Sequence, residues 1–189
     1  MKLQLRTMLF AAMFAALTAV GAFIKIPIFP YPVPITLQTA FVYLCGLLLP
    51  PKAALFSQLT YVLLGLVGIP VFTGGGGIGY VLNPTFGYLL AFVFAAPLMS
   101  KLARGTLYQP RPRKLRFALG GAAILLLVQL CGVGYMALIS AVYLGQPLPL
   151  SRAVYLVYIF LPLDLIKLAL VAPLSLQLRR RAPSLFAAL

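Results

Sequence analysis

The sequence predicts an all-α membrane protein with six transmembrane helices. Of its 189 residues, 63% are hydrophobic and 8% are charged, whereas a soluble domain carries about 25% charged residues. Apolar runs alternate with short proline-rich, glycine-rich or basic segments, and spans of about 20 residues leave little chain for a soluble part. We therefore expect one integral-membrane domain over residues 1–189, with spans at about residues 8–24, 37–49, 53–66, 85–102, 117–144 and 153–178.

The first span carries alanines spaced four residues apart. This spacing places small side chains in a ridge along the helix, which lets another helix approach closely in lipid, where van der Waals packing replaces the hydrophobic driving force. The ridge serves either packing inside this bundle or contact with another protein, and the spacing alone does not separate the two. Its residues are Ala11, Ala15 and Ala19, with Ala12 and Ala16 beside them.

A proline-rich segment separates the first two spans. Residues 27–36, PIFPYPVPIT, contain four prolines and predict an extended loop, because proline fixes φ and cannot donate a backbone hydrogen bond. The next two spans are short and are joined at Pro50-Pro51-Lys52, which predicts a helical hairpin. Its polar side chains either satisfy a neighbouring helix or meet a ligand; they are Gln38, Gln58 and Tyr61.

A glycine-rich connection precedes the fourth span. Within residues 68–85, Gly74, Gly76 and Gly79 match the pattern GxGxxG. No predicted strand precedes them and no acidic residue follows about 20 positions on, so a dinucleotide site is excluded. The four consecutive glycines instead predict a flexible loop whose backbone approaches a ligand or another loop closely.

The basic residues predict the orientation in the membrane. If the N-terminus is cytoplasmic, that side holds twelve Lys and Arg residues, six of them in residues 101–116, while the other side holds only Lys25 and Arg152. By the positive-inside rule, both termini are then cytoplasmic, and the proline and glycine loops face outward. The formal charge of +14 therefore reflects membrane topology rather than nucleic-acid binding.

The last span contains the only acidic residue of the chain, Asp164, near its centre. Lys167 follows three positions later, so both side chains face the same way on a helix. A charge at the centre of a membrane helix costs about 2.5–3.5 kcal/mol on insertion scales, and such residues usually have a function. The pair either forms part of a binding site or neutralises itself as internal bracing.

The residue inventory excludes most enzyme chemistry. One carboxylate rules out paired-carboxylate hydrolysis and two-metal sites, and the absence of histidine rules out a Ser/His/Asp triad. No P-loop is present for ATP hydrolysis. We expect no metal and no cofactor. A site with one carboxylate, one ammonium and one amide, Asn83, suits a small, largely apolar solute.

Two longer segments resemble a known family. Residues 30–92, from PYPVPITLQTAF to NPTFGYLLAF, and residues 158–171, YIFLPLDLIKLALV, are similar to the BioY family, the biotin-binding S components of energy-coupling factor (ECF) transporters. The resemblance implies a six-helix subunit of the bacterial plasma membrane that captures biotin from outside. It also implies partners that supply the energy, namely a transmembrane coupling subunit and two ATPase subunits.

The same resemblance implies roles for particular residues. Asp164, Lys167 and Asn83 would hold biotin, and the loops around Thr36 and Gly74-Gly75 would close over it. Tyr88 and Tyr158 are further candidates for lining the ring, or else pack as ordinary interfacial aromatics. Ala12 and Ala16 would form the docking face for the coupling subunit.

Two other functional classes stay open on the sequence. One is a proton-coupled secondary carrier that uses Asp164 as its proton site, which would need no ATPase partner. The chain shows no obvious internal repeat, which counts against a carrier. The other is an intramembrane enzyme with Asp164 as general base, which would release a chemically changed ligand.

Overall fold

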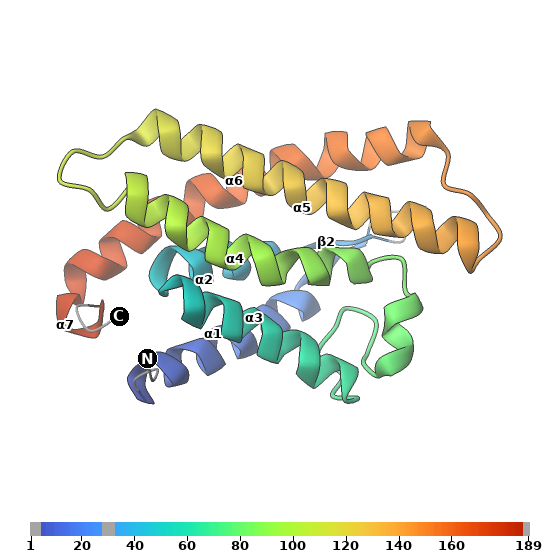
Figure 1. Ribbon diagram of the computed structural model, residues 1–189, viewed down its shortest axis with the longest axis horizontal. Coiled ribbons are helices and arrows are strands. Elements are labelled where there is room, and N and C mark those ends of the chain that lie inside the picture. The colour runs from blue at the N-terminus through green and yellow to red at the C-terminus, as the bar shows by residue number, and fades with distance from the viewer. Residues whose placement is uncertain (1–4, 28–32, 187–189) are drawn as a thin grey trace.

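Helices dominate the computed structural model, which describes residues 5–27 and 33–186 (Figure 1). The α-helices are α1 (Leu5–Phe23), α2 (Gln38–Leu48), α3 (Pro51–Leu66), α4 (Phe86–Thr106), α5 (Lys114–Val142), α6 (Leu150–Arg181) and the short α7 (Pro183–Phe186). Two strands, β1 (Lys25–Ile26) and β2 (Ile35–Thr36), and a 3₁₀ helix, η1 (Ile78–Leu82), lie between them. The predicted all-α class is confirmed.

Four helices in the described residues are long and apolar enough to cross a membrane: α1, α4, α5 and α6. The helical hairpin is also present, but α2 has 11 residues and α3 has 16. Pro51 occupies the first turn of α3, where its missing N–H would have no helical partner in any case. The chain is thus a multi-pass membrane protein, and six complete spans stay a prediction.

The short helix α2 lies inside the bundle. It contacts α1, α4 and α6, and α4 in turn packs against α3 and α5. Nine of the 11 residues of α2 are buried, which explains why its sequence is apolar on every side. Because α2 is surrounded, a polar side chain on it must find its partner on another helix or in a cavity.

A two-stranded antiparallel ribbon occupies part of the proline-rich segment. Lys25 pairs with Thr36 and Ile26 pairs with Ile35, which agrees with the predicted extended conformation. Residues 28–32 of this segment lie outside the described residues. The ribbon leads directly into α2 and so places Thr36 beside the start of that helix.

The glycine loop is packed against the end of α3. The Phe72 ring covers Gly65 so closely that a Cβ at Gly65 would lie 2.0 Å from a ring carbon, and the N–H of Gly77 donates to the carbonyl of Gly65 at 2.7 Å. Gly75 and Gly77 have positive φ angles, which explains why glycine is needed there. The loop backbone does make a close approach, but its partner is the end of a helix rather than the predicted ligand or second loop.

The two ends of the bundle differ in character. Helix α1 begins at the same end of the molecule as α6 finishes, and the basic connection between α4 and α5 also lies there (Figure 1). The glycine loop and the α5–α6 connection lie at the opposite end. This arrangement agrees with the grouping of basic residues on one side of the membrane.

Candidate functional site

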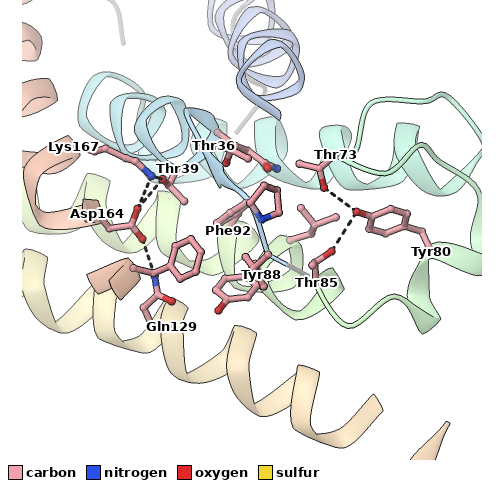
Figure 2. A pocket seen from close by; sticks show the side chains of 15 residues that line it. Thr36, Thr39, Thr73, Tyr80, Thr85, Tyr88, Phe92, Gln129, Asp164 and Lys167 are labelled. Carbon is pink, nitrogen blue, oxygen red and sulfur yellow. Dashed lines mark hydrogen bonds and ion pairs between the residues drawn. The ribbon is translucent and has the colours of Figure 1, made fainter. Parts of the chain in front are cut away.

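Asp164 is held by three helices in the interior of the bundle. Its side chain is almost completely buried, and Oδ1 accepts a hydrogen bond from Thr39 Oγ1 on α2 at 2.8 Å. Oδ2 accepts from Gln129 Nε2 on α5 at 2.8 Å (Figure 2). Both carboxylate oxygens therefore have a donor, and the carboxylate links α2, α5 and α6.

Lys167 completes this group as an ion pair. Its Nζ lies 3.0 Å from Asp164 Oδ1 and also donates to Thr39 Oγ1 at 2.8 Å. The predicted common face of the two charged side chains is confirmed, and the pair carries no net charge. An unpaired charge buried in low dielectric would be far more costly.

The ion pair lies in the wall of a cavity. The cavity has an empty volume of about 520 Å³, which includes the open space at its mouth. Only about 50 Å³ of this volume can be reached by the centre of a water-sized sphere. The cavity is therefore narrow, with side chains close on every side. Its walls come from the β2–α2 segment, the glycine loop, α4, α5 and α6: Val33, Pro34, Thr36, Gln38, Thr39, Thr73, Tyr80, Thr85, Tyr88, Leu89, Phe92, Gln129, Phe160, Asp164 and Lys167.

Two buried polar atoms in this wall have no hydrogen-bond partner among the described residues. They are the hydroxyl of Tyr88 on α4 and Oε1 of Gln129 on α5. Most buried polar groups in native proteins are paired, so each exception calls for an explanation. Both residues line the cavity, and a bound ligand with polar groups would supply the missing partners.

The mouth of the cavity is built from hydroxyl groups. Tyr80 at the end of the glycine loop places its hydroxyl 3.1 Å from Thr73 Oγ1 and 3.2 Å from Thr85 Oγ1 (Figure 2). The Tyr80 ring packs on the buried Phe72, with ring centroids 4.6 Å apart. The packed glycine loop thus positions the polar rim of the cavity.

Asn83 lies outside the cavity wall. Its Oδ1 accepts from the backbone N–H of Thr85 at 2.9 Å and from Thr85 Oγ1 at 2.8 Å, an arrangement that shapes the turn before α4. It lines a neighbouring outer hollow together with Gly74. The structure therefore does not place the Asn83 amide beside the ion pair, because local backbone bonding occupies its oxygen.

Tyr158 points away from the site, in contrast to Thr36 and Tyr88, which line the cavity. Its side chain is 75% exposed. The buried positions of α6 recur every four residues through Phe160 and Asp164, and residue 158 falls on the other side of the helix.

Gly75 is likewise absent from the cavity wall; it forms a turn by pairing with Phe72.

Thr39 and Gln129 were not among the site residues predicted from the sequence. Gln129 had a visible signal, since it is a lone amide near the middle of a long apolar helix, where a polar side chain needs a partner. Thr39 carried no such signal, because threonine is common in membrane helices. Its role depends on the packing of α2 against α6.

Ala12 and Ala16 lie on an exposed face of α1, whereas Ala11 and Ala15 are buried against the bundle. The two series of alanines therefore have different surroundings. The first packs inside the chain, and the second leaves a smooth strip of small side chains free on the outside of α1.

Comparisons with known proteins agree with this architecture. The profile of the BioY family matches residues 1–184. A "Probable biotin transporter BioY" from Lysinibacillus sphaericus is 47% identical over 135 residues, covering 71% of this chain and 66%, slightly under two thirds, of that protein. The "Biotin transporter BioY" of Thermotoga maritima is 34% identical over 181 residues, covering 93% of this chain and 97% of that protein.

A solved structure has the same fold. It is the crystal structure of "the S-component for biotin from an ECF-type ABC transporter", which is 29% identical to this chain. The match has a TM-score of 0.75 and covers 92% of this chain and 90% of the other. The structural similarity thus extends over most of the chain.

The packing of Tyr88 against α5 yields a test of the cavity wall. A Cβ at Gly132 would lie 2.3 Å from the Tyr88 ring, whereas nothing lies within 4 Å of a Cβ at Gly134 on the same helix. We expect Gly132→Ala to displace Tyr88 and to lower the midpoint of thermal unfolding in detergent by several degrees, since overpacking costs about 1–3 kcal/mol.

Gly134→Ala is the matched control, because it makes the same change on the same helix without the contact. It should leave the unfolding midpoint unchanged or raise it slightly through better helix propensity. Equal midpoints for the two variants would contradict the described position of Tyr88.

Proposed function

This chain belongs to the BioY family, and from that premise we propose that it captures biotin in the cavity beside Asp164 as the S component of an ECF-type transporter. The names of its relatives and of the matching solved structure support the ligand and the class of transporter. The observation that carries the proposal is a cavity whose wall combines the only carboxylate of the chain with two unpaired buried polar groups.

The ion pair is complementary to the ureido ring of biotin. That ring presents N–H donors next to a carbonyl acceptor. Asp164 Oδ2 accepts from Gln129, and a carboxylate oxygen can accept a second donor, while the Lys167 ammonium uses two of its three hydrogens on Asp164 and Thr39. The pair therefore offers one free acceptor position beside one free donor, which matches a ureido N–H and carbonyl.

The two unpaired groups fit the remainder of the ring system. The ureido ring has a second N–H, and Gln129 Oε1 is a buried acceptor with no partner of its own among the described residues. The Tyr88 hydroxyl is available beside it and Phe92 and Phe160 supply apolar surface. Satisfying buried polar groups in this way favours the correct ligand over analogues that leave them unpaired.

We place the valerate carboxylate toward the mouth. The deep end of the cavity is neutral as a whole, and burying a carboxylate without a net cation is costly. At the mouth the carboxylate would remain close to water. Lys25 lies near this rim, where its Nζ donates to the carbonyl of Thr73 at 2.7 Å. In the reverse orientation Lys167 would bind the carboxylate.

Entry of biotin requires movement at the mouth, because the cavity is narrow as described. The hydroxyl contacts of Tyr80 with Thr73 and Thr85 fix this rim of the opening within the glycine-rich connection. These are neutral hydrogen bonds, each worth about 0.5–1.5 kcal/mol, so the rim side chains can rearrange at little cost while Phe72 stays packed on α3. The loop around Thr36 forms the other side of the same opening.

Transport would depend on partner subunits. The sequence contains no P-loop, so the energy of ATP hydrolysis must come from another chain. We propose that the exposed strip of Ala12 and Ala16 on α1 contacts the transmembrane coupling subunit, because small side chains permit close helix contact in lipid. Two ATPase subunits would complete the assembly in the bacterial plasma membrane, with both termini of this chain on the cytoplasmic side of six spans.

Replacing Asp164 with asparagine tests the binding site. The substitution leaves Lys167 without its ion partner and presents an amide hydrogen toward a ureido N–H. We expect biotin affinity to fall roughly ten- to hundredfold, as for loss of a charged hydrogen-bond partner, when measured by isothermal titration calorimetry on the purified protein.

Tyr158→Phe is the control for this measurement, since Tyr158 is exposed on α6 and should bind biotin as the unmodified chain does. An Asp164→Asn protein that binds biotin with unchanged affinity would show that the site lies elsewhere.

The orientation of the ligand can be tested with biotinamide, in which a neutral amide replaces the carboxylate. If the carboxylate lies at the hydrated mouth, we expect biotinamide to bind within about fivefold of biotin. A loss of more than about tenfold, the size expected for a charged hydrogen bond, would instead place the carboxylate at Lys167. The measurement is a competition assay against labelled biotin.

The alanine strip gives a test of coupling. Ala12→Leu together with Ala16→Leu should leave biotin binding unchanged, because both residues lie outside the cavity, and should strongly reduce uptake in cells that contain the partner subunits. Cys131→Leu on α5 is the control, since Cys131 is also exposed but lies on another helix.

The same uptake assay separates this mechanism from a proton-coupled carrier. Uptake that persists without the ATPase subunits and collapses with an uncoupler would favour the carrier. Uptake that disappears when the partner subunits are removed would favour the S component.

A further inference from the structure

A cluster of basic and aromatic residues lies at the end of the bundle far from the glycine loop. Helices α4 and α6 finish at this end (Figure 1), and they bring together Arg104, Tyr108 and Arg179. The Arg179 guanidinium lies over the Tyr108 ring, 4.2 Å from its centroid. Burial raises the pKa of Tyr108, and the hydrogen bond with Ser175 and the charges of Arg179 and Arg104 oppose this effect.

The position of Arg179 is explained by the fold. The last carbonyls of α2 have no partner within the helix, and Arg179 Nη2 donates to the carbonyl of Leu48 at 2.8 Å. The hydroxyl of Tyr108 donates to the carbonyl of Leu47 at 2.8 Å. A cation and a hydroxyl thus cap the negative end of the α2 dipole.

Arg104 has no comparable explanation. Its Nε and Nη2 atoms are shielded from water and have no acceptor within the part of the chain that the structure describes. An arginine cannot escape this situation by losing its proton. The carboxylate that would normally pair with it is missing, because Asp164 is the only acidic side chain and is held by Thr39, Gln129 and Lys167.

The surroundings of Arg104 indicate which anion fits. Arg104 lies in the last turn of α4, a helix long and apolar enough to span a membrane, so it lies at the depth of lipid headgroups. One turn away on the same side of the helix is the exposed Lys101. An exposed apolar stripe then continues along α4 through Leu98, Phe94 and Leu90, four residues apart and therefore on one face.

We propose that this corner is a binding site for an anionic phospholipid. Arg104 Nε and Nη2 have the planar fork geometry suited to two phosphate oxygens. Because both atoms are shielded from water, the guanidinium must turn outward for the headgroup phosphate to accept from them. Lys101 adds charge attraction, and an acyl chain lies along the stripe of Leu98, Phe94 and Leu90. The continuity of guanidinium and apolar stripe favours a lipid over a free anion, since only a lipid uses both.

Native mass spectrometry of the purified chain in detergent tests this site, with phosphatidylglycerol and phosphatidylcholine of identical acyl chains as probes. We expect the unmodified chain to bind phosphatidylglycerol at least about tenfold more tightly, as for one charged hydrogen-bonded contact. Arg104→Gln should abolish this preference. Arg116→Gln, which removes one exposed positive charge from the same basic segment, should retain it.

Three results would overturn the proposal: no preference in the unmodified chain, a preference retained by Arg104→Gln, or an equal loss in Arg116→Gln. If Arg104→Gln fails to fold, Arg104→Lys keeps the charge without the fork and should lose part of the preference; full retention would overturn the two-oxygen contact. Inorganic phosphate is a third probe, which tests whether a free anion is enough. If it raises the unfolding midpoint as much as phosphatidylglycerol does, the site takes a free anion and the lipid assignment is wrong.

Discussion

The buried ion pair is the interaction on which the rest of the structure depends. Asp164 sits on a membrane helix, where a charge is costly, and the cost is offset because Thr39, Gln129 and Lys167 all donate to it. These donors come from α2, α5 and α6. Removing one of them leaves an unpaired buried charge or dipole, so the proposed binding site is also the place where three helices are held together.

Two kinds of polar group in the interior bear on the site. Some are satisfied between helices: Gln38 donates to the Tyr61 hydroxyl, which donates to the carbonyl of Val71, and so ties α2, α3 and the glycine loop together. Others, Tyr88 and Gln129, keep unpaired atoms in the cavity wall. The first kind builds the scaffold, and the second kind leaves interaction energy available to a solute.

The sequence predicted the helical class, the ion pair and the separation of basic residues because each depends on composition or on spacing within one helix. It did not predict Thr39, whose importance comes from the contact of α2 with α6. In the structure Asn83 lies outside the cavity wall, because its oxygen is used by the turn before α4, and Tyr158 falls on the exposed side of α6. Sequence alone does not account for these positions, because it specifies the order of residues but not which face of each helix points inward.

The unpaired groups also link binding to stability. An unsatisfied buried polar atom costs about 1–3 kcal/mol, so the empty protein carries this cost at Tyr88 and again at Gln129. A ligand that pairs both groups removes the cost and stabilises the folded state through its binding free energy. In the proposed function, the cavity wall would therefore both select the solute and be stabilised by it, so a cavity between three helices need not weaken the protein once a ligand is bound.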